Sequence, residues 1–163
     1  MGKFGNNHQG SALFRGINRI NLDVKGRLAI PTRYRDRLRE CCASELIVTV
    51  DPDRCLLVYP LPEWTQIEQV LMKLPTFNES ARILQRLLVG HATEVQMDGQ
   101  GRVLLPTPLR EFAGLQKQTV MIGQGARFEL WDETRWTEKQ ESWLEKADLE
   151  QLKFSPELEN LSI

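Results

Sequence analysis

An internal repeat is the feature that most restricts how this 163-residue chain can fold. The segment 22–36 (LDVKGRLAIPTRYRD) aligns with the segment 97–111 (MDGQGRVLLPTPLRE). The identical positions are Asp23/Asp98, Gly26/Gly101, Arg27/Arg102, Pro31/Pro106, Thr32/Thr107 and Arg35/Arg110. Further along, 56–59 aligns with 128–131 and Trp64 with Trp136. The chain is therefore expected to contain two copies of one small structural unit.

Each copy begins with the pattern of two strands separated by a turn. Polar and apolar residues alternate over 18–22, which is typical of a half-buried strand. The turn is predicted from Asp, which can hydrogen-bond the backbone ahead of it, and from Gly, which adopts a positive φ without strain. The turn-forming residues are Asp23 and Gly26 in the first copy and Asp98 and Gly101 in the second. Residues 27–30 are predicted to return as the second strand of a hairpin.

A short helix and two further strands complete each copy. Pro31 ends the second strand, and Thr32 is the predicted cap of the helix. In the second copy Thr107 is followed by Pro108, a residue favoured at the first helical position. The predicted helices cover about 33–39 and 108–112, and the predicted strands cover 45–50, 56–59, 119–122 and 127–131.

Helical periodicity occupies the segments that follow each copy. Between the copies, two helices are predicted, one on each side of Pro75. The apolar face of the first comprises Trp64, Ile67, Val70, Leu71 and Leu74, and that of the second comprises Ile83, Leu84, Leu87 and Leu88. After the second copy, helical spacing links Trp136, Gln140, Trp143, Leu144 and Ala147. The predicted organisation is a leader (1–13), a first repeat (14–63), a helical connector (64–91), a second repeat (92–135) and a C-terminal helix with an acidic tail (136–163).

The order of elements predicts an α+β fold. A β-β-α-β-β order with a long helix after each copy does not suit a parallel, doubly wound sheet. One copy of about 45 residues is small for a hydrophobic core of its own. We therefore expect the two pseudo-symmetric copies to interleave in one β-barrel, with the remaining helices flanking it.

Charge is distributed unevenly along the chain. The net charge is −1, yet the stretch from Leu13 to Arg39 carries eight basic residues against two acidic ones. From Asp132 to the end, nine acidic residues face four basic ones. This asymmetry favours an anionic partner for the N-terminal part of the chain.

The sequence gives little support for an enzyme, a metal protein or a membrane protein. Three cysteines and two histidines do not supply four zinc ligands at suitable spacing, and no cofactor motif is present. Carboxylates cluster at 51–53 and at 132–133 without an accompanying His, Cys or Ser constellation, so no catalytic residue is assigned. No apolar run approaches the roughly 18 residues of a membrane helix, and 1–13 lacks the apolar segment of a signal peptide.

Several longer motifs are similar to those of a known family. They are 14–16 (FRG), Asp23-x-Lys25-Gly26-Arg27, 31–35 (PTRYR), 59–64 (YPLPEW), 85–90 (QRLLVG) and 128–131 (FELW). In this order they resemble the MraZ family of the AbrB-like (SpoVT-AbrB) superfamily over about residues 14–150. The second copy departs from the pattern, because Gln100 stands where Lys25 stands in the first.

The resemblance implies both a fold and a function. The implied fold is a swapped-hairpin, double-split β-barrel formed by both halves of one chain. The implied protein is a ring-like homo-oligomer in the cytoplasm, associated with the nucleoid. The implied activity is repression of the division and cell-wall gene cluster, including the regulator's own gene.

Basic residues around the first turn are the predicted DNA contacts. Arginine donating two hydrogen bonds to guanine is the commonest base contact, and a turn carrying Lys25 and Arg27 has the shape to enter a major groove. The other predicted DNA-binding residues, mostly for phosphate contacts, are Arg15, Arg19, Arg33, Arg35 and Arg102. The expected partner is double-stranded DNA with direct repeats spaced by about one helical turn.

Two alternatives remain open from the sequence. Because Arg27 and Arg102 recur in both copies, each can instead pair with Asp23 or Asp98 simply to hold the fold. AbrB-type folds also occur in antitoxins, so a protein-interaction module that covers a toxin is the alternative function. The short tail and the second folded copy favour a regulator.

Overall fold

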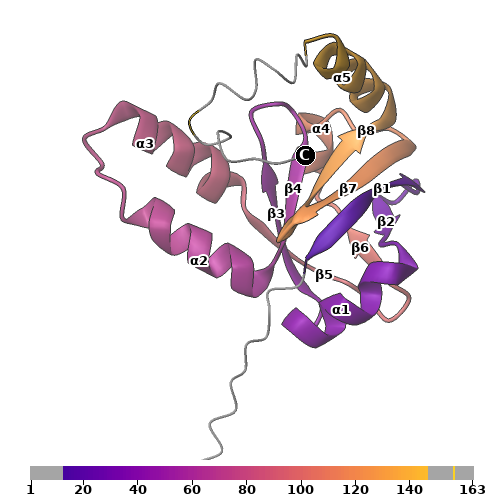
Figure 1. Ribbon diagram of the computed structural model, residues 1–163. Helices are drawn as coiled ribbons and strands as arrows, with labels where there is room; N and C mark the ends of the chain where they lie inside the picture. The colour runs from indigo at the N-terminus through magenta and orange to yellow at the C-terminus, as the bar shows by residue number, and fades with distance from the viewer. Residues whose placement is uncertain (1–12, 147–155, 157–163) are drawn as a thin grey trace, which may run out of the picture. The chain divides into compact units, whose positions relative to one another are not determined.

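The computed structural model describes residues 13–146 and Pro156 (Figure 1). Most of the predicted leader, Ala147 and most of the acidic tail lie outside the described residues. Of the described residues, those up to Asp132 belong to one compact unit, and those from Glu133 onward belong to a second. Among the helices of the described ranges, none has the length and apolar character needed to cross a bilayer.

The first unit contains two β-β-α-β-β repeats joined by a helical connector. The first repeat comprises β1 (Phe14–Asn21), β2 (Arg27–Ala29), α1 (Thr32–Cys42), β3 (Glu45–Val50) and β4 (Leu56–Pro60). The connector comprises α2 (Leu61–Met72), α3 (Glu79–Leu84) and the π-helical turn η1 (Gln85–Val89). The second repeat comprises β5 (Thr93–Gln96), β6 (Arg102–Leu104), α4 (Thr107–Phe112), β7 (Gln118–Gly125) and β8 (Arg127–Asp132). The predicted order of elements and the α+β class are confirmed.

The strands of the two repeats interleave in an antiparallel sheet of order β1-β7-β8-β4-β3-β5. The first strand of each repeat lies against the third strand of the other, β1 on β7 and β5 on β3. Between them, β4 and β8 pair in a register centred on Leu57 and Glu129, which are equivalent positions of the two repeats. The repeats are thus related by a local twofold. Backbone pairing does not close this sheet into a barrel within the part of the chain that the structure describes.

The prediction that the first two strands of a repeat pair with each other as a hairpin is wrong. The second strands β2 and β6 form a separate two-stranded ribbon with each other, with Leu28 directly opposite Val103. Within the described chain, a single bridge between Leu22 and Leu28 joins β2 to the residue that follows β1. Each of these three-residue strands has one inward side chain, Leu28 in β2 and Val103 in β6. Pairing across the repeats places these two side chains against each other, and both are almost fully buried.

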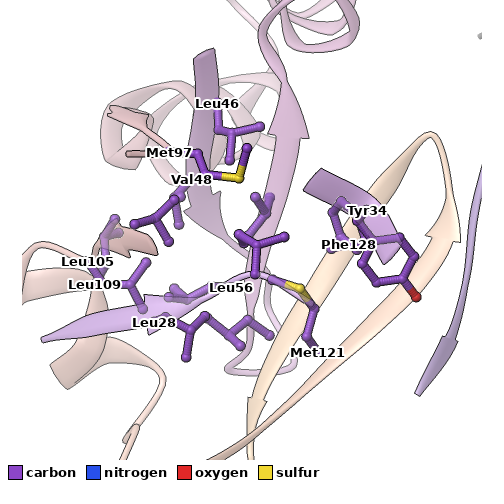
Figure 2. Packing of buried hydrophobic residues seen from close by; sticks show 14 of the residues in the cluster. Leu28, Tyr34, Leu46, Val48, Leu56, Met97, Leu105, Leu109, Met121 and Phe128 are labelled. Carbon is purple, nitrogen blue, oxygen red and sulfur yellow. The ribbon is translucent and has the colours of Figure 1, made fainter. Parts of the chain in front are cut away.

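One hydrophobic core is shared by both repeats (Figure 2). It is formed by side chains from both sheets and from α1 and α4, including Leu28, Leu38, Leu56, Leu105, Leu109 and Met121. An aromatic group also belongs to it, in which the Phe128 ring centroid lies 4.3 Å from that of Phe14 and 4.9 Å from that of Tyr34. Neither repeat could bury these side chains alone, which explains how units of such small size are stable.

The connector packs on the outer face of β3 and β4 (Figure 1). Trp64 and Leu71 of α2 are buried against Ile47, Leu57 and Tyr59. The π-helical turn frees backbone carbonyls that need other partners. The Thr49 hydroxyl donates to the Leu88 carbonyl at 2.6 Å, so strand β3 satisfies one of them.

Three details of the predicted helices are corrected. Thr32 is the first residue of α1 rather than its cap, because Pro31 occupies the N-cap and no side chain caps the helix. Val70 is 64% exposed, because it lies at the margin of the α2 face that carries Trp64. Ile83 and Leu84 are also exposed, and the predicted common face does not form, because Leu87 and Leu88 pack against two different core clusters.

The second unit contains α5 (Glu133–Lys146), and the predicted helix after the second repeat is confirmed. Trp136 and Trp143 lie two turns apart on it, with ring centroids 5.7 Å apart.

Candidate nucleic-acid interface

The first turn is held together by Asp23. Its Oδ1 accepts hydrogen bonds from the amides of Lys25 and Arg27, both at 2.9 Å, and its Oδ2 pairs with Arg27 Nε at 2.7 Å. The Gly26 amide donates to the Asp23 carbonyl at 3.0 Å, and Gly26 has a φ of +83°, which favours glycine. Hydrogen bonding by the Arg27 amide holds the pKa of Asp23 below its ordinary value despite partial desolvation.

The second turn repeats this geometry. Asp98 Oδ1 accepts from the amides of Gln100 and Arg102 at 2.9 Å, and Oδ2 pairs with Arg102 Nε at 3.3 Å. Gly101 has a φ of +79°, and its amide donates to the Asp98 carbonyl. Hydrogen bonding by the Arg102 amide likewise lowers the pKa of Asp98. Both aspartates are therefore charged at neutral pH and their turns are fixed by the same set of bonds.

The β2–β6 ribbon brings the two salt-bridged arginines onto one face. Because Leu28 and Val103 point into the core, the residues on either side of each point outward. The outer face therefore carries Arg27 opposite Leu104 and Arg102 opposite Ala29. The two arginines lie on neighbouring strands and are offset by two residues along the ribbon. Their Cα atoms are therefore about 8 Å apart. The turns extend in opposite directions from this common face.

Each arginine keeps hydrogen-bonding capacity on this face. The Asp23 and Asp98 contacts use the Nε–H of Arg27 and Arg102. Among the described residues, the two terminal amino groups of each guanidinium have no hydrogen-bond partner, and about a third of each side chain is exposed. The pairing of Arg27 with Asp23 therefore leaves the guanidinium able to donate to an acceptor outside the protein.

The tips of the two turns differ in chemistry. The first carries Val24, whose side chain is fully exposed, next to the exposed Lys25. The second carries Gly99 and Gln100, which have neither an apolar side chain nor a charge. The sequence placed Val24 within the predicted turn but gave no sign that its side chain is fully exposed.

The remaining predicted DNA-contacting arginines divide into two groups. Arg15 and Arg19 are exposed on β1, and Arg33 of α1 reaches the same strand, where its Nη2 donates to Asn18 Oδ1 at 2.8 Å. The Arg33 guanidinium also lies over the Tyr34 ring, with Cζ 4.7 Å from the centroid. Arg35 is separate from these, because it is half-buried and packs against Gly101 of the second turn.

A residue that the sequence reasoning left out, Arg110, has the position in the second repeat that Arg35 has in the first. It packs against Gly26 of the first turn. The signal for it was present, since Arg35 and Arg110 are one of the identical pairs of the repeat. What the alignment could not show is that each arginine reaches the turn of the other repeat.

These features define a class of α+β protein in which two interleaved repeats present two Asp–Arg turns on one ribbon. The profile of a family described as "MraZ protein, putative antitoxin-like" matches residues 13–87 and 88–153. The chain belongs to the MraZ family.

Curated relatives share more than half of their residues with this chain. A protein of Thioalkalivibrio sulfidiphilus is 56% identical over 93% of this chain and 100% of its own length. One of Methylococcus capsulatus is 56% identical over 90% of this chain and 97% of its own length, and one of Halorhodospira halophila is 53% identical over 93% and 100%. Each of these relatives is named "Transcriptional regulator MraZ".

Proposed function

We propose that this protein is a transcription regulator that binds double-stranded DNA through the β2–β6 ribbon and its two turns. The observation that carries the proposal is the outer face of the ribbon, where the Cα atoms of Arg27 and Arg102 lie about 8 Å apart and their terminal amino groups bond no residue of the described chain. The major groove of DNA admits a two-stranded β-ribbon, and arginine donating two hydrogen bonds to guanine is the commonest base-specific contact. The names of the relatives support a role in transcription.

The residues around the ribbon have different roles in this proposal. Arg27 and Arg102 contact base edges, and Lys25 contacts a base or a nearby phosphate. Arg15, Arg19 and Arg33 hold the DNA through its phosphates, which fixes the register without reading the sequence. Neutralising phosphates releases counterions, so affinity falls steeply as salt rises.

The finer points follow from the family resemblance and are proposed with it. The fold is of the swapped-hairpin, AbrB-like type, in which the β2–β6 ribbon completes the barrel begun by the six-stranded sheet. The protein represses the division and cell-wall gene cluster that contains its own gene, at the nucleoid. Its sites are direct repeats spaced by about one helical turn, so several ribbons of an oligomeric ring bind at once and raise the affinity by multivalency.

The connector offers a surface on which copies can meet. Its exposed apolar side chains are Val70, Met72, Phe77, Ile83 and Leu84, with Phe77 97% exposed. Beside them lies a groove of about 380 Å³, lined in part by Met72, Val89 and the stems of Arg82 and Arg86. An exposed aromatic ring and an apolar groove on the same connector suit contact between copies of the chain. We propose a second copy as the occupant, with a partner protein as the competing outcome.

Fluorescence anisotropy with a duplex from the region upstream of the gene tests the proposal, with a scrambled duplex of equal length beside it. Arg27→Ala is expected to weaken binding about tenfold to a hundredfold, because one good bidentate base contact is worth roughly 1 to 3 kcal/mol. Arg39→Ala is the matched control, since Arg39 is exposed and pairs with Asp36 on α1.

The salt dependence separates the competing functions. Tight binding of the upstream duplex that weakens with salt and is lost in Arg27→Ala supports the regulator. Equal, weak binding to both duplexes, unchanged by the substitution, refutes it and favours the antitoxin-like alternative, in which the protein covers a toxin.

A further inference from the structure

The two DNA-facing turns are each supported by an arginine of the opposite repeat. Gly26 is buried although it belongs to a polar turn at the surface, and the group that covers it is the guanidinium of Arg110. A Cβ atom at Gly26 would lie 2.7 Å from Arg110 Cζ. At Gly101, also buried, a Cβ atom would lie 2.6 Å from Arg35 Cζ. The guanidinium groups therefore pack directly on the glycine backbone.

The same arginines are tied into the backbone next to the turn that they cover. Arg110 Nε donates to the Leu105 carbonyl at 3.1 Å, and the Leu105 amide donates to the Gly26 carbonyl at 2.9 Å. In the other repeat, Arg35 Nε donates to the Ile30 carbonyl at 2.7 Å, and the Ile30 amide donates to the Gly101 carbonyl at 2.8 Å. One residue thus bonds both the arginine and the glycine, so that arginine, linking residue and turn form one bracket.

Two features set these brackets apart from direct DNA contacts. Both arginines are half-buried with their Nε–H used within the protein, and Arg110 Nη2 also donates to Thr107 Oγ1 at 2.8 Å. The arrangement also occurs twice, at equivalent residues of repeats that differ at most other positions. A planar guanidinium can lie flat on a glycine and donate in its own plane, which a lysine ammonium cannot do.

We propose that Arg35 and Arg110 are positioning residues that set the direction in which the turn of the opposite repeat presents its side chains to DNA. Arg110 orients Lys25 and Arg27, and Arg35 orients Arg102. The effect of these arginines on DNA binding rests on the proposed function. Their role in fixing the turns rests on the two brackets alone. It reassigns Arg35, which the sequence suggested as a phosphate contact.

The test is a crossed pair of charge-preserving variants, Arg110→Lys and Arg35→Lys, in the full-length protein. Hydrogen exchange is followed by mass spectrometry, without DNA, on peptides that cover 22–29 and 97–104 and exclude the linking residues Ile30 and Leu105, whose amides bond the opposite turn. Arg110→Lys is expected to speed exchange about tenfold in 22–29 and to leave 97–104 unchanged, because it removes one hydrogen bond from a charged donor. Arg35→Lys is expected to do the reverse. Arg39→Lys, on the exposed face of α1, is the control that changes neither.

DNA binding supplies a second readout. Loss of a phosphate contact reduces the slope of log affinity against log salt by about 0.9, whereas loss of positioning lowers affinity at every salt with the slope unchanged. Because a lysine would keep a phosphate contact, this readout uses Arg110→Gln, which is expected to weaken binding severalfold with an unchanged slope.

The outcomes separate this inference from the proposed function. Equal acceleration of exchange in both peptides, or a reduced salt slope with unchanged exchange, would overturn the positioning role. If the two variants show the crossed exchange pattern but the wild-type protein binds no duplex, the brackets are supported and the DNA-binding function is refuted.

Discussion

Replacing Gly26 by alanine puts the geometry of the first turn to a quantitative test. At a φ of +83° a residue with a Cβ costs about 1 to 2 kcal/mol relative to glycine. The new Cβ would lie 2.7 Å from Arg110 Cζ, so the guanidinium must move and its hydrogen bond to the Leu105 carbonyl is lost. A bond from a charged donor contributes about 1.5 to 3 kcal/mol, and the lower end applies because Arg110 is half exposed. The expected loss of unfolding free energy is about 3 kcal/mol.

Equilibrium urea denaturation followed by tryptophan fluorescence measures this loss, at one fixed protein concentration because assembly would add to the apparent stability. Gly99→Ala is the matched control in the second turn, since a Cβ there meets no atom within 4 Å. It should change the free energy by less than about 0.5 kcal/mol.

A double variant isolates the contribution of Arg110. In an Arg110→Ala background, Gly26→Ala has no guanidinium to displace, so its cost should fall to the backbone part of about 1 to 2 kcal/mol. Equal losses for Gly26→Ala and Gly99→Ala, or full additivity with Arg110→Ala, would refute the packing of the guanidinium on the turn.

Three further predictions concern the core, the turn carboxylates and the thiols. Leu28→Ala, in the core side of the ribbon, should lower the unfolding free energy by about 3 kcal/mol, whereas Leu104→Ala on its exposed side should change it by less than about 1 kcal/mol, as measured by urea denaturation. Because the folded pKa values of Asp23 and Asp98 are lowered, their contribution to stability is present above about pH 4 and is lost as the pH falls through the folded values. The double variant Asp23→Asn, Asp98→Asn should therefore melt below the wild type at pH 7 and approach it near pH 2, while the exposed control Glu40→Gln follows the wild type; a constant gap at both pH values would contradict this. Burial raises the pKa of the Cys42 thiol to about 12 and also raises that of Cys55, so native iodoacetamide labelling at pH 8, read by mass spectrometry, should modify the half-exposed Cys41 first; rapid labelling of Cys55 would show that its site is open.

The local parts of the fold could be predicted from the sequence because short-range chemistry fixes them. An Asp three residues before a Gly defines the bonds of each turn, and these bonds involve only neighbouring residues. Strand β3 begins and ends at the predicted residues, because a short and nearly continuous apolar run marks a buried strand.

The partner of a short strand could not be predicted in this way. β2 has only three residues with one buried side chain, and this pattern suits pairing with β1 as well as with β6. The choice depends on the whole core, since only the cross-repeat pairing places Leu28 on Val103. The contacts of Arg35 and Arg110 with the turns could not be predicted for the same reason. Each contact joins the two repeats, and residue spacing within one repeat does not indicate it.

The local twofold of the backbone is not shared by the side chains. Equivalent positions of the two repeats carry Lys25 and Gln100 at the turn tips, and Arg19 and Glu94 on the first strands. A dimer of identical subunits would carry the same residue at both places and would read a sequence and its reverse complement alike. Because both halves belong to one chain, the two ends of the ribbon carry different side chains. Under the proposed function, DNA lying along the ribbon would be bound in one orientation, and a row of such ribbons would require sites that all point in the same direction.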